Sequence, residues 1–214
     1  MATSKTSRST KNSLPPGEPK AAPRQPAQTK NAGTAMLALL RGINVGGHKR
    51  VPMTELRSVA TALGFTAVQT YIQSGNLVFC TTLTPVAAEA RLEQAIQAHF
   101  GFAVPVVCRT RAQWEHYAEG SAFPDAATER PNLLHLGLAK ATAIPGAGEA
   151  LSRYATAGER FHIDGDAIWL DYAAGVARSK LTPVVLDRAF GSAVTARNWR
   201  TVQALLQHLQ ESVS

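Results

Sequence analysis

The sequence predicts an α+β fold built from two similar halves in tandem. After the first 34 residues, short apolar runs typical of strands alternate with amphipathic segments typical of helices, in the order βαββαβ. The same order then returns with matching helix start and stop signals: Thr84-Pro85-Val86 recurs as Thr182-Pro183-Val184, and Phe100-Gly101 recurs as Phe190-Gly191. Repeated signals in one order indicate a diverged internal duplication.

Local signals place the elements of the first half. Residues 36–41 are apolar at nearly every position, which is typical of a strand buried on both faces. Pro52 begins a helix with one apolar stripe that ends at Gly64, and Thr84 caps a second helix that ends at Gly101. The other strands are expected at 67–73, 77–80 and 104–109, the first two joined by the tight turn Ser74-Gly75-Asn76.

The second half repeats this plan after an extra helix expected at residues 111–119. Arg197, Asn198 and Trp199 are expected to open a last helix, and they match the segment from Arg111 to Trp114. The order βαββαβ is that of a ferredoxin-like unit, so we predict two such units, each followed by an extra helix. The remaining strands are expected at 133–138, 160–163, 167–172 and 193–196, with helices after Pro145 and Pro183.

The strand order of a ferredoxin-like sheet, 4-1-3-2, predicts which loops lie together. The end of the first strand lies beside the turn between the second and third strands, which places residues 41–47 next to residues 73–76. In the second half, the ends of the third and fourth strands share one edge. The loop at residues 179–180 is therefore expected near residues 197–199.

Composition divides the chain into three parts. Residues 1–34 contain five prolines and almost no large apolar side chain, so we expect a disordered basic tail. This tail carries +5 of the formal net charge of +7, which leaves nucleic acid a weakly supported partner of the folded part. The first half is expected to span residues 35–125 and the second half residues 126–214.

The sequence favours a cytoplasmic protein without a membrane partner. No apolar run approaches the roughly 18 residues that a membrane helix needs, and the basic tail lacks the apolar stretch of a secretory signal. Cys80 and Cys108 fall on strands that flank the first strand, about 9.6 Å apart, which exceeds the reach of a disulfide. Both thiols are expected to be reduced, as in the cytoplasm.

The stretch Arg41-Gly-Ile-Asn-Val-Gly-Gly47 follows an apolar strand and precedes a helix. Such a loop directs backbone N–H groups and a helix start at one point, which suits an anion. It is not a phosphate loop of a nucleotide triphosphatase, because His48 stands where that motif needs lysine and Lys49 where it needs serine or threonine. A glycine-rich turn with solvated charges is the alternative interpretation.

Three further segments carry polar groups that could join this loop: the turn at 73–76, Ser179 with Lys180, and the segment at 197–199. We expect the two halves to pack so that these segments form one site for a small phosphate- or carboxylate-bearing ligand. The scattered histidines predict no metal site, and the sequence identifies neither a catalytic residue nor a cofactor. The candidate ligand-binding residues are Arg41, Gly42, Asn44, Gly46, Gly47, Gln73, Ser74, Asn76, Ser179, Lys180, Arg197, Asn198 and Trp199.

Together these motifs resemble the family called domain of unknown function 1697, over essentially all of residues 36–214. The matching positions are Arg41 to Gly47, Met53 with Leu56-Arg57, Gln73 to Asn76, Ser179-Lys180-Leu181, and Thr195, Arg197-Asn198-Trp199 and Thr201. The resemblance implies a ferredoxin-like α/β fold and a small cytoplasmic protein of a mostly bacterial family, without an assigned activity.

Two other functions compete with ligand binding. An RNA-binding module needs exposed aromatic side chains on the sheet, and Trp169 and Tyr172 are the candidates for that role in the second half. A structural or protein-interaction domain without catalysis is the third hypothesis.

Overall fold

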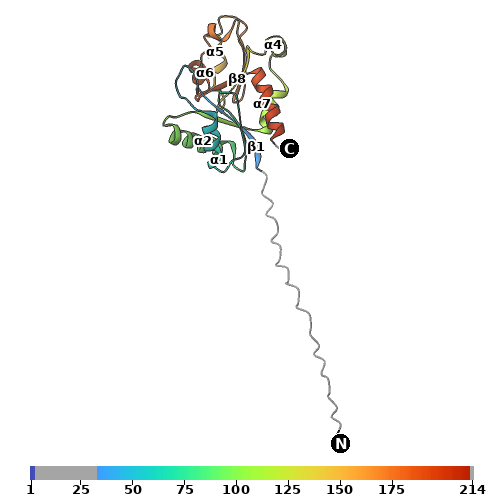
Figure 1. Cartoon of the computed structure of the whole chain (residues 1–214). Helices are drawn as coiled ribbons and strands as arrows, with labels where there is room; N and C mark the ends of the chain where they lie inside the picture. The colour runs from blue at the N-terminus through green and yellow to red at the C-terminus, as the bar shows by residue number, and fades with distance from the viewer. Residues whose placement is uncertain (3–32, 213–214) are drawn as a thin grey trace. The chain divides into compact units, whose positions relative to one another are not determined.

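Two four-stranded antiparallel sheets, each with helices between its strands, form the fold (Figure 1). The computed structural model describes residues 1–2 and 33–212. The tail expected at residues 1–34 lies almost entirely outside the described residues, and the expected division near residue 125 falls inside a short helix, α4 (Pro124–Glu129). Residues 33–212 belong to one compact unit, and everything described below lies within it.

The first sheet has the strand order β2-β3-β1-β4, which confirms the predicted ferredoxin-like order. Helices α1 (Met53–Ala62) and α2 (Pro85–Phe100) connect its strands. Thr84 caps α2, as predicted, because its side chain accepts a hydrogen bond from the N–H of Ala87. The strands are β1 (Thr34–Leu40), β2 (Thr66–Tyr71), β3 (Asn76–Thr81) and β4 (Val106–Thr110).

The second sheet repeats this order as β6-β7-β5-β8. Helices α5 (Ala147–Ser152) and α6 (Pro183–Phe190) connect its strands, and Thr182 caps α6 as Thr84 caps α2. A short 3-10 helix at Val176–Arg178 was not expected. The strands are β5 (Leu134–Leu138), β6 (Arg160–Asp164), β7 (Ala167–Asp171) and β8 (Thr195–Asn198).

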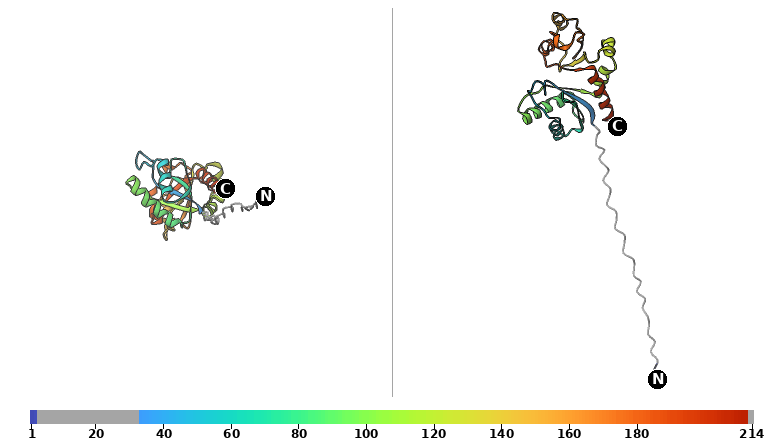
Figure 2. Two further views of the ribbon diagram at one scale, coloured as in Figure 1. Left: turned by 60° about the horizontal axis from the view of Figure 1, so that its bottom comes forward. Right: turned by 45° about the horizontal axis from the view of Figure 1, so that its top comes forward.

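Three hydrophobic clusters hold these layers together. One lies between the first sheet and α1 and α2, and one lies between the second sheet and α5 and α6. The central cluster joins the other faces of both sheets with the two extra helices, α3 (Arg111–Glu119) and α7 (Trp199–Glu211). Figure 2 shows α7 beside β1, and the indole N–H of Trp114 donates to the carbonyl of Val202, 3.2 Å away.

Strand β1 is buried on both faces, as its sequence predicts. Leu37 and Leu39 belong to the central cluster, whereas Met36 and Leu40 face α1 and α2, because successive side chains of a strand point to opposite faces. Cys80 and Cys108 are both free, and they lie on β3 and β4 as expected.

The last strand lies two residues further along the chain than predicted. Strand β8 includes Arg197 and Asn198, which were expected to open the last helix. Asn198 is at the same time the N-cap of α7, because its side chain accepts a hydrogen bond from the N–H of Thr201 at 2.9 Å, so the helix does open at this segment. The register places Arg197 opposite Leu136, and its side chain therefore leaves the strand on the face that meets the other half.

None of the helices in the described part of the chain has the length and apolar character that crossing a bilayer requires.

Candidate functional site

The glycine-rich loop joins β1 to α1 and is fixed at both ends by hydrogen bonds. The N–H of Leu40 donates to the carbonyl of Gly75 at 2.8 Å. The side-chain amide of Asn44 donates to the carbonyls of Gln73 and Val51, and its oxygen accepts from the N–H of Val51. The loop therefore lies beside the β2-β3 turn, as the strand order predicts.

The backbone of this loop is strained. Five of the eight residues from 42 to 49 have positive φ angles, and two of them, Asn44 at 54° and Lys49 at 47°, are not glycine. A third strained residue, Ile72, lies beside Gln73 with φ 47°, and a β-branched side chain makes that conformation costly. Strain of this kind concentrates at ligand-binding segments.

A cavity of about 340 Å³ opens where the loop meets the start of α1. The first N–H groups of a helix have no partner within it, and Pro52 at the N-cap position supplies no side-chain acceptor. Two arginines, Arg50 and Arg57, also line this cavity. The lining residues are Asn44, Arg50, Val51, Pro52, Met53, Thr54, Arg57 and Gln73.

Arg197, by contrast, is buried in the contact between the two halves, with 8% of its surface exposed. Its Nε donates to the side chain of Asn76 at 2.6 Å, and Nη1 donates to Thr195 and to the carbonyl of Ala196. Its Nη2 donates to the carbonyls of Leu40, Ser74 and Gly75. All five donors of this guanidinium are thus engaged by acceptors within the protein. Burial lowers the pKa of Arg197 to about 10, which leaves it charged at neutral pH.

Gly75 lies where the turn, the loop and Arg197 meet. A Cβ atom there would lie 2.7 Å from Cδ1 of Ile43 and 2.8 Å from Cβ of Leu40, and the φ angle is +78°. Replacing Gly75 by alanine should therefore destabilise the protein by roughly 3 kcal/mol, from left-handed strain and from crowding together. Urea unfolding followed by circular dichroism measures the change.

Gly47→Ala is the matched control for that substitution. Gly47 has nearly the same φ angle, +80°, but open space around its Cα, so the variant reports strain alone, about 1 to 2 kcal/mol. Equal losses in the two variants would contradict the close packing around Gly75.

Arg109 on β4 is the counterpart of Arg197, a relationship that the sequence comparison missed by matching Arg111. Each arginine directly precedes the N-cap residue of an extra helix. Arg109 donates to the carbonyl of Ala139, after β5, at 2.7 Å, and Arg197 donates to that of Leu40, at the end of β1, at 3.0 Å. The two halves are therefore joined by reciprocal arginine contacts.

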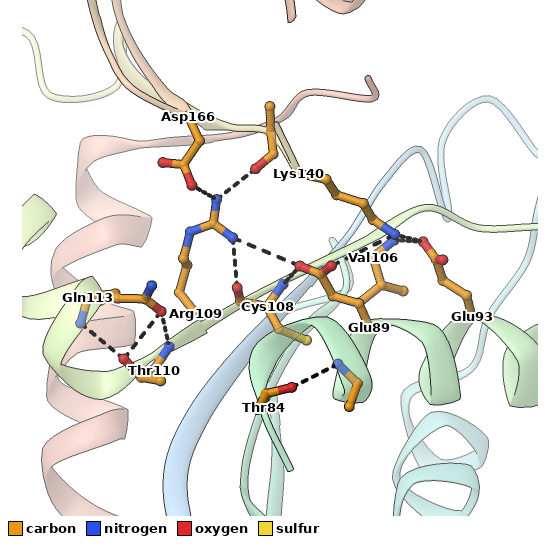
Figure 3. A network of polar contacts seen from close by, with 12 residues as sticks. Thr84, Glu89, Glu93, Val106, Cys108, Arg109, Thr110, Gln113, Lys140 and Asp166 are labelled. Carbon is orange, nitrogen blue, oxygen red and sulfur yellow. Dashed lines mark hydrogen bonds and ion pairs between the residues drawn. The ribbon is translucent and has the colours of Figure 1, made fainter. Parts of the chain in front are cut away.

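Besides backbone carbonyls, Arg109 has two carboxylate partners (Figure 3), whereas the acceptors of Arg197 are uncharged. Its Nη2 lies 2.8 Å from a carboxylate oxygen of Asp166, and its Nη1 lies 3.9 Å from the buried carboxylate of Glu89. Burial raises the pKa of Glu89, although a hydrogen bond from Cys108 and the charges of Lys140 and Arg109 act against that rise.

Four other candidate residues do not line the cavity at the start of α1: Arg41, Ser179, Lys180 and Trp199. Arg41 pairs with Asp187 on α6 at 2.6 Å. A hydrogen bond from Ser179 and the charge of Lys180 hold the pKa of Glu159 below its usual value. Trp199 packs edge-on against Trp169. Within the described residues, neither Ser179 nor Lys180 has a hydrogen bond to the glycine-rich loop.

The profile of a family described as "Protein of unknown function (DUF1697)" matches residues 34–169, which is more than half of the chain. The chain belongs to this family. The DUF1697 match covers the glycine-rich loop, α1 and the β2-β3 turn, and hence every residue that lines the cavity at the start of α1.

One solved structure supports the same fold. It is described as "The structure of conserved bacterial protein SP0830 from Streptococcus pneumoniae", and it is 23% identical to this DUF1697 member with a TM-score of 0.62. The match covers 82% of this chain and 98% of the streptococcal chain. No curated protein matches the sequence.

The two aromatic residues that suggested an RNA platform are buried in this DUF1697 member. Trp169 is 4% exposed in the central cluster, and Tyr172 is 5% exposed behind the second sheet. Burial raises the pKa of Tyr172 to about 12. Neither ring offers the exposed face on which a base could stack.

Proposed function

We propose that this protein binds a small phosphate- or carboxylate-bearing ligand in the cavity at the start of α1. The observation that carries the proposal is that two arginines and an uncapped helix start line one cavity. A helix N-terminus attracts anions through its free N–H groups and its dipole. The site lies within the first half, whereas the sequence had suggested a site shared between the halves.

The charges around the cavity favour an anion. Within the described residues, the side chain of Arg50 is exposed and has no ion pair, and Arg57 donates only to the hydroxyl of Thr70, at 2.7 Å. The acidic residue of the first helical turn, Glu55, pairs with His99 at 3.0 Å and is not part of the lining. The positive charge of the arginines is therefore not neutralised within the cavity.

Binding without catalysis fits this lining better than an enzymatic reaction. The lining residues include no histidine, cysteine, aspartate or glutamate, which are the usual proton carriers and nucleophiles. Arginines, an amide and backbone N–H groups recognise charge and hydrogen-bonding groups instead.

Arg50→Gln tests the site directly. Pyrophosphate should raise the melting temperature of the wild-type protein, because a ligand at about 100 times its Kd stabilises a fold by about 2.7 kcal/mol. The variant should lose most of this shift and keep the melting temperature of the unliganded protein, since Arg50 is exposed.

Arg91→Gln on α2 is the control, because it removes one exposed positive charge outside this cavity. Citrate and inorganic phosphate are tested beside pyrophosphate to separate carboxylate from phosphate recognition. An equal loss of the thermal shift in both variants would mean that the net charge of the protein, and not this cavity, causes the shift. No thermal shift with any of the three anions would exclude the proposed site.

A further inference from the structure

The second half contains a different kind of cavity, which is independent of the proposed anion site. Its volume is about 230 Å³, and it lies between α5, α6 and the loop that precedes α5. Its walls are almost entirely apolar. The side chains that form them include Ile144, Ala147, Ala150, Leu151, Val185 and Ala189.

Two polar side chains complete the lining, Arg188 and Tyr154. Within the described residues, neither the guanidinium of Arg188 nor the hydroxyl of Tyr154 has a hydrogen-bond partner. Arg188 is exposed on the last turn of α6 and directly precedes Ala189 in the wall. The cavity therefore has an apolar interior and a cation at its lining.

The neighbouring carboxylates do not neutralise Arg188. Asp187 is held by Arg41 at 2.6 Å and accepts from the N–H of Val194 at 2.9 Å. Glu149 on α5 pairs with Arg153 at 2.7 Å. A ligand carboxylate would give Arg188 the charged partner that these two residues do not supply.

We propose that this cavity binds a small carboxylic acid with an apolar body, with the carboxylate on Arg188 and the body against the alanine-rich walls. A cavity of roughly 150 Å³ accepts benzene, so this one has room for a six-membered ring and a short side arm. The small side chains of Ala147, Ala150 and Ala189 keep the space open. Tyr154 would provide a hydroxyl donor for the same carboxylate.

Titration of the full chain with phenylacetate tests this proposal by calorimetry and by NMR chemical shifts. We expect saturable binding by the wild-type protein, with shifts concentrated at α5 and α6. Phenylacetamide, which lacks the charge, and acetate, which lacks the apolar body, should each bind at least about tenfold more weakly. Absence of saturation by phenylacetate below about 10 mM would overturn the proposal.

Three variants locate the site. Arg188→Gln should weaken phenylacetate binding about tenfold or more, and Ala150→Leu, at an exposed position of the wall, should abolish it by filling the cavity. Arg200→Gln removes an exposed charge on α7, outside the cavity, and should leave the affinity unchanged. Full affinity in Arg188→Gln or in Ala150→Leu would contradict the proposed placement.

Arg50→Gln separates this inference from the anion site in the first half. That variant should bind phenylacetate with wild-type affinity, because Arg50 does not line the cavity between α5 and α6. Weakened binding in Arg50→Gln and in no other variant would assign phenylacetate to the first cavity and overturn the second.

Discussion

Replacing Arg197 by alanine should lower the free energy of unfolding by roughly 4 kcal/mol or more. Its guanidinium supplies donors to the side chain of Asn76 and to the carbonyls of Leu40, Ser74 and Gly75, all on the opposite half. The carbonyl of Gly75 keeps the N–H of Leu40 as a donor, but each buried acceptor that loses its only donor costs about 1 to 3 kcal/mol, and the truncated side chain leaves a cavity as well.

Urea unfolding followed by circular dichroism measures this loss, and Arg200→Ala is the matched control. Arg200 is exposed on the first turn of α7, so its removal should change stability by less than about 0.5 kcal/mol. Arg197→Lys should recover little stability, because an ammonium group cannot reproduce the planar fork of donors. A loss below about 1 kcal/mol in Arg197→Ala would contradict a stabilising role of this residue in the contact between the halves.

The fold was predictable from the sequence because its signals are local and repeated. Apolar runs, prolines at helix starts and glycines at helix ends located both sheets, and the shared order of Thr84-Pro85 and Thr182-Pro183 revealed the duplication. Helix α5, which also has six residues, was expected after Pro145, whereas the six-residue helix α4 was missed. Its contacts are tertiary: Arg130, which follows it, pairs with Asp171 on β7 at 2.8 Å.

The polar residues were harder to interpret because their partners are distant in the chain. Arg197 is a candidate ligand contact in the sequence, and its acceptors in the structure include backbone carbonyls of the first half, which carry no sequence signature. Arg109 gave no signal at all, since it ends an otherwise apolar run. Asn44 and Gln73 do line a cavity as part of the candidate set, whereas Arg50, which lines the same cavity, is not in that set.

Replacing Arg109 by methionine should destabilise the protein by roughly 3 to 5 kcal/mol at neutral pH, the usual effect of leaving a buried charge without its partner. The carboxylate of Glu89 would remain buried with less compensation, and Asp166 would lose a contact at 2.8 Å. Arg111→Met, at a half-exposed position two residues away, should have little effect and serves as the control.

The pH dependence of the free energy of unfolding should distinguish the contacts of Arg109 from those of Arg197. Burial already raises the pKa of Glu89, and removal of Arg109 should raise it further. A carboxyl group with a raised pKa in the folded state favours folding when protonated, and that contribution is lost as the pH rises through the folded-state pKa.

The deficit of Arg109→Met relative to the wild type should therefore shrink as the pH falls from about 7 toward 5. The deficit of Arg197→Ala should stay nearly constant over the same interval, because the acceptors of Arg197 are uncharged. Urea unfolding at both pH values measures both deficits. If they change in parallel with pH, the stability lost with Arg109 does not come from its contacts with Glu89 and Asp166.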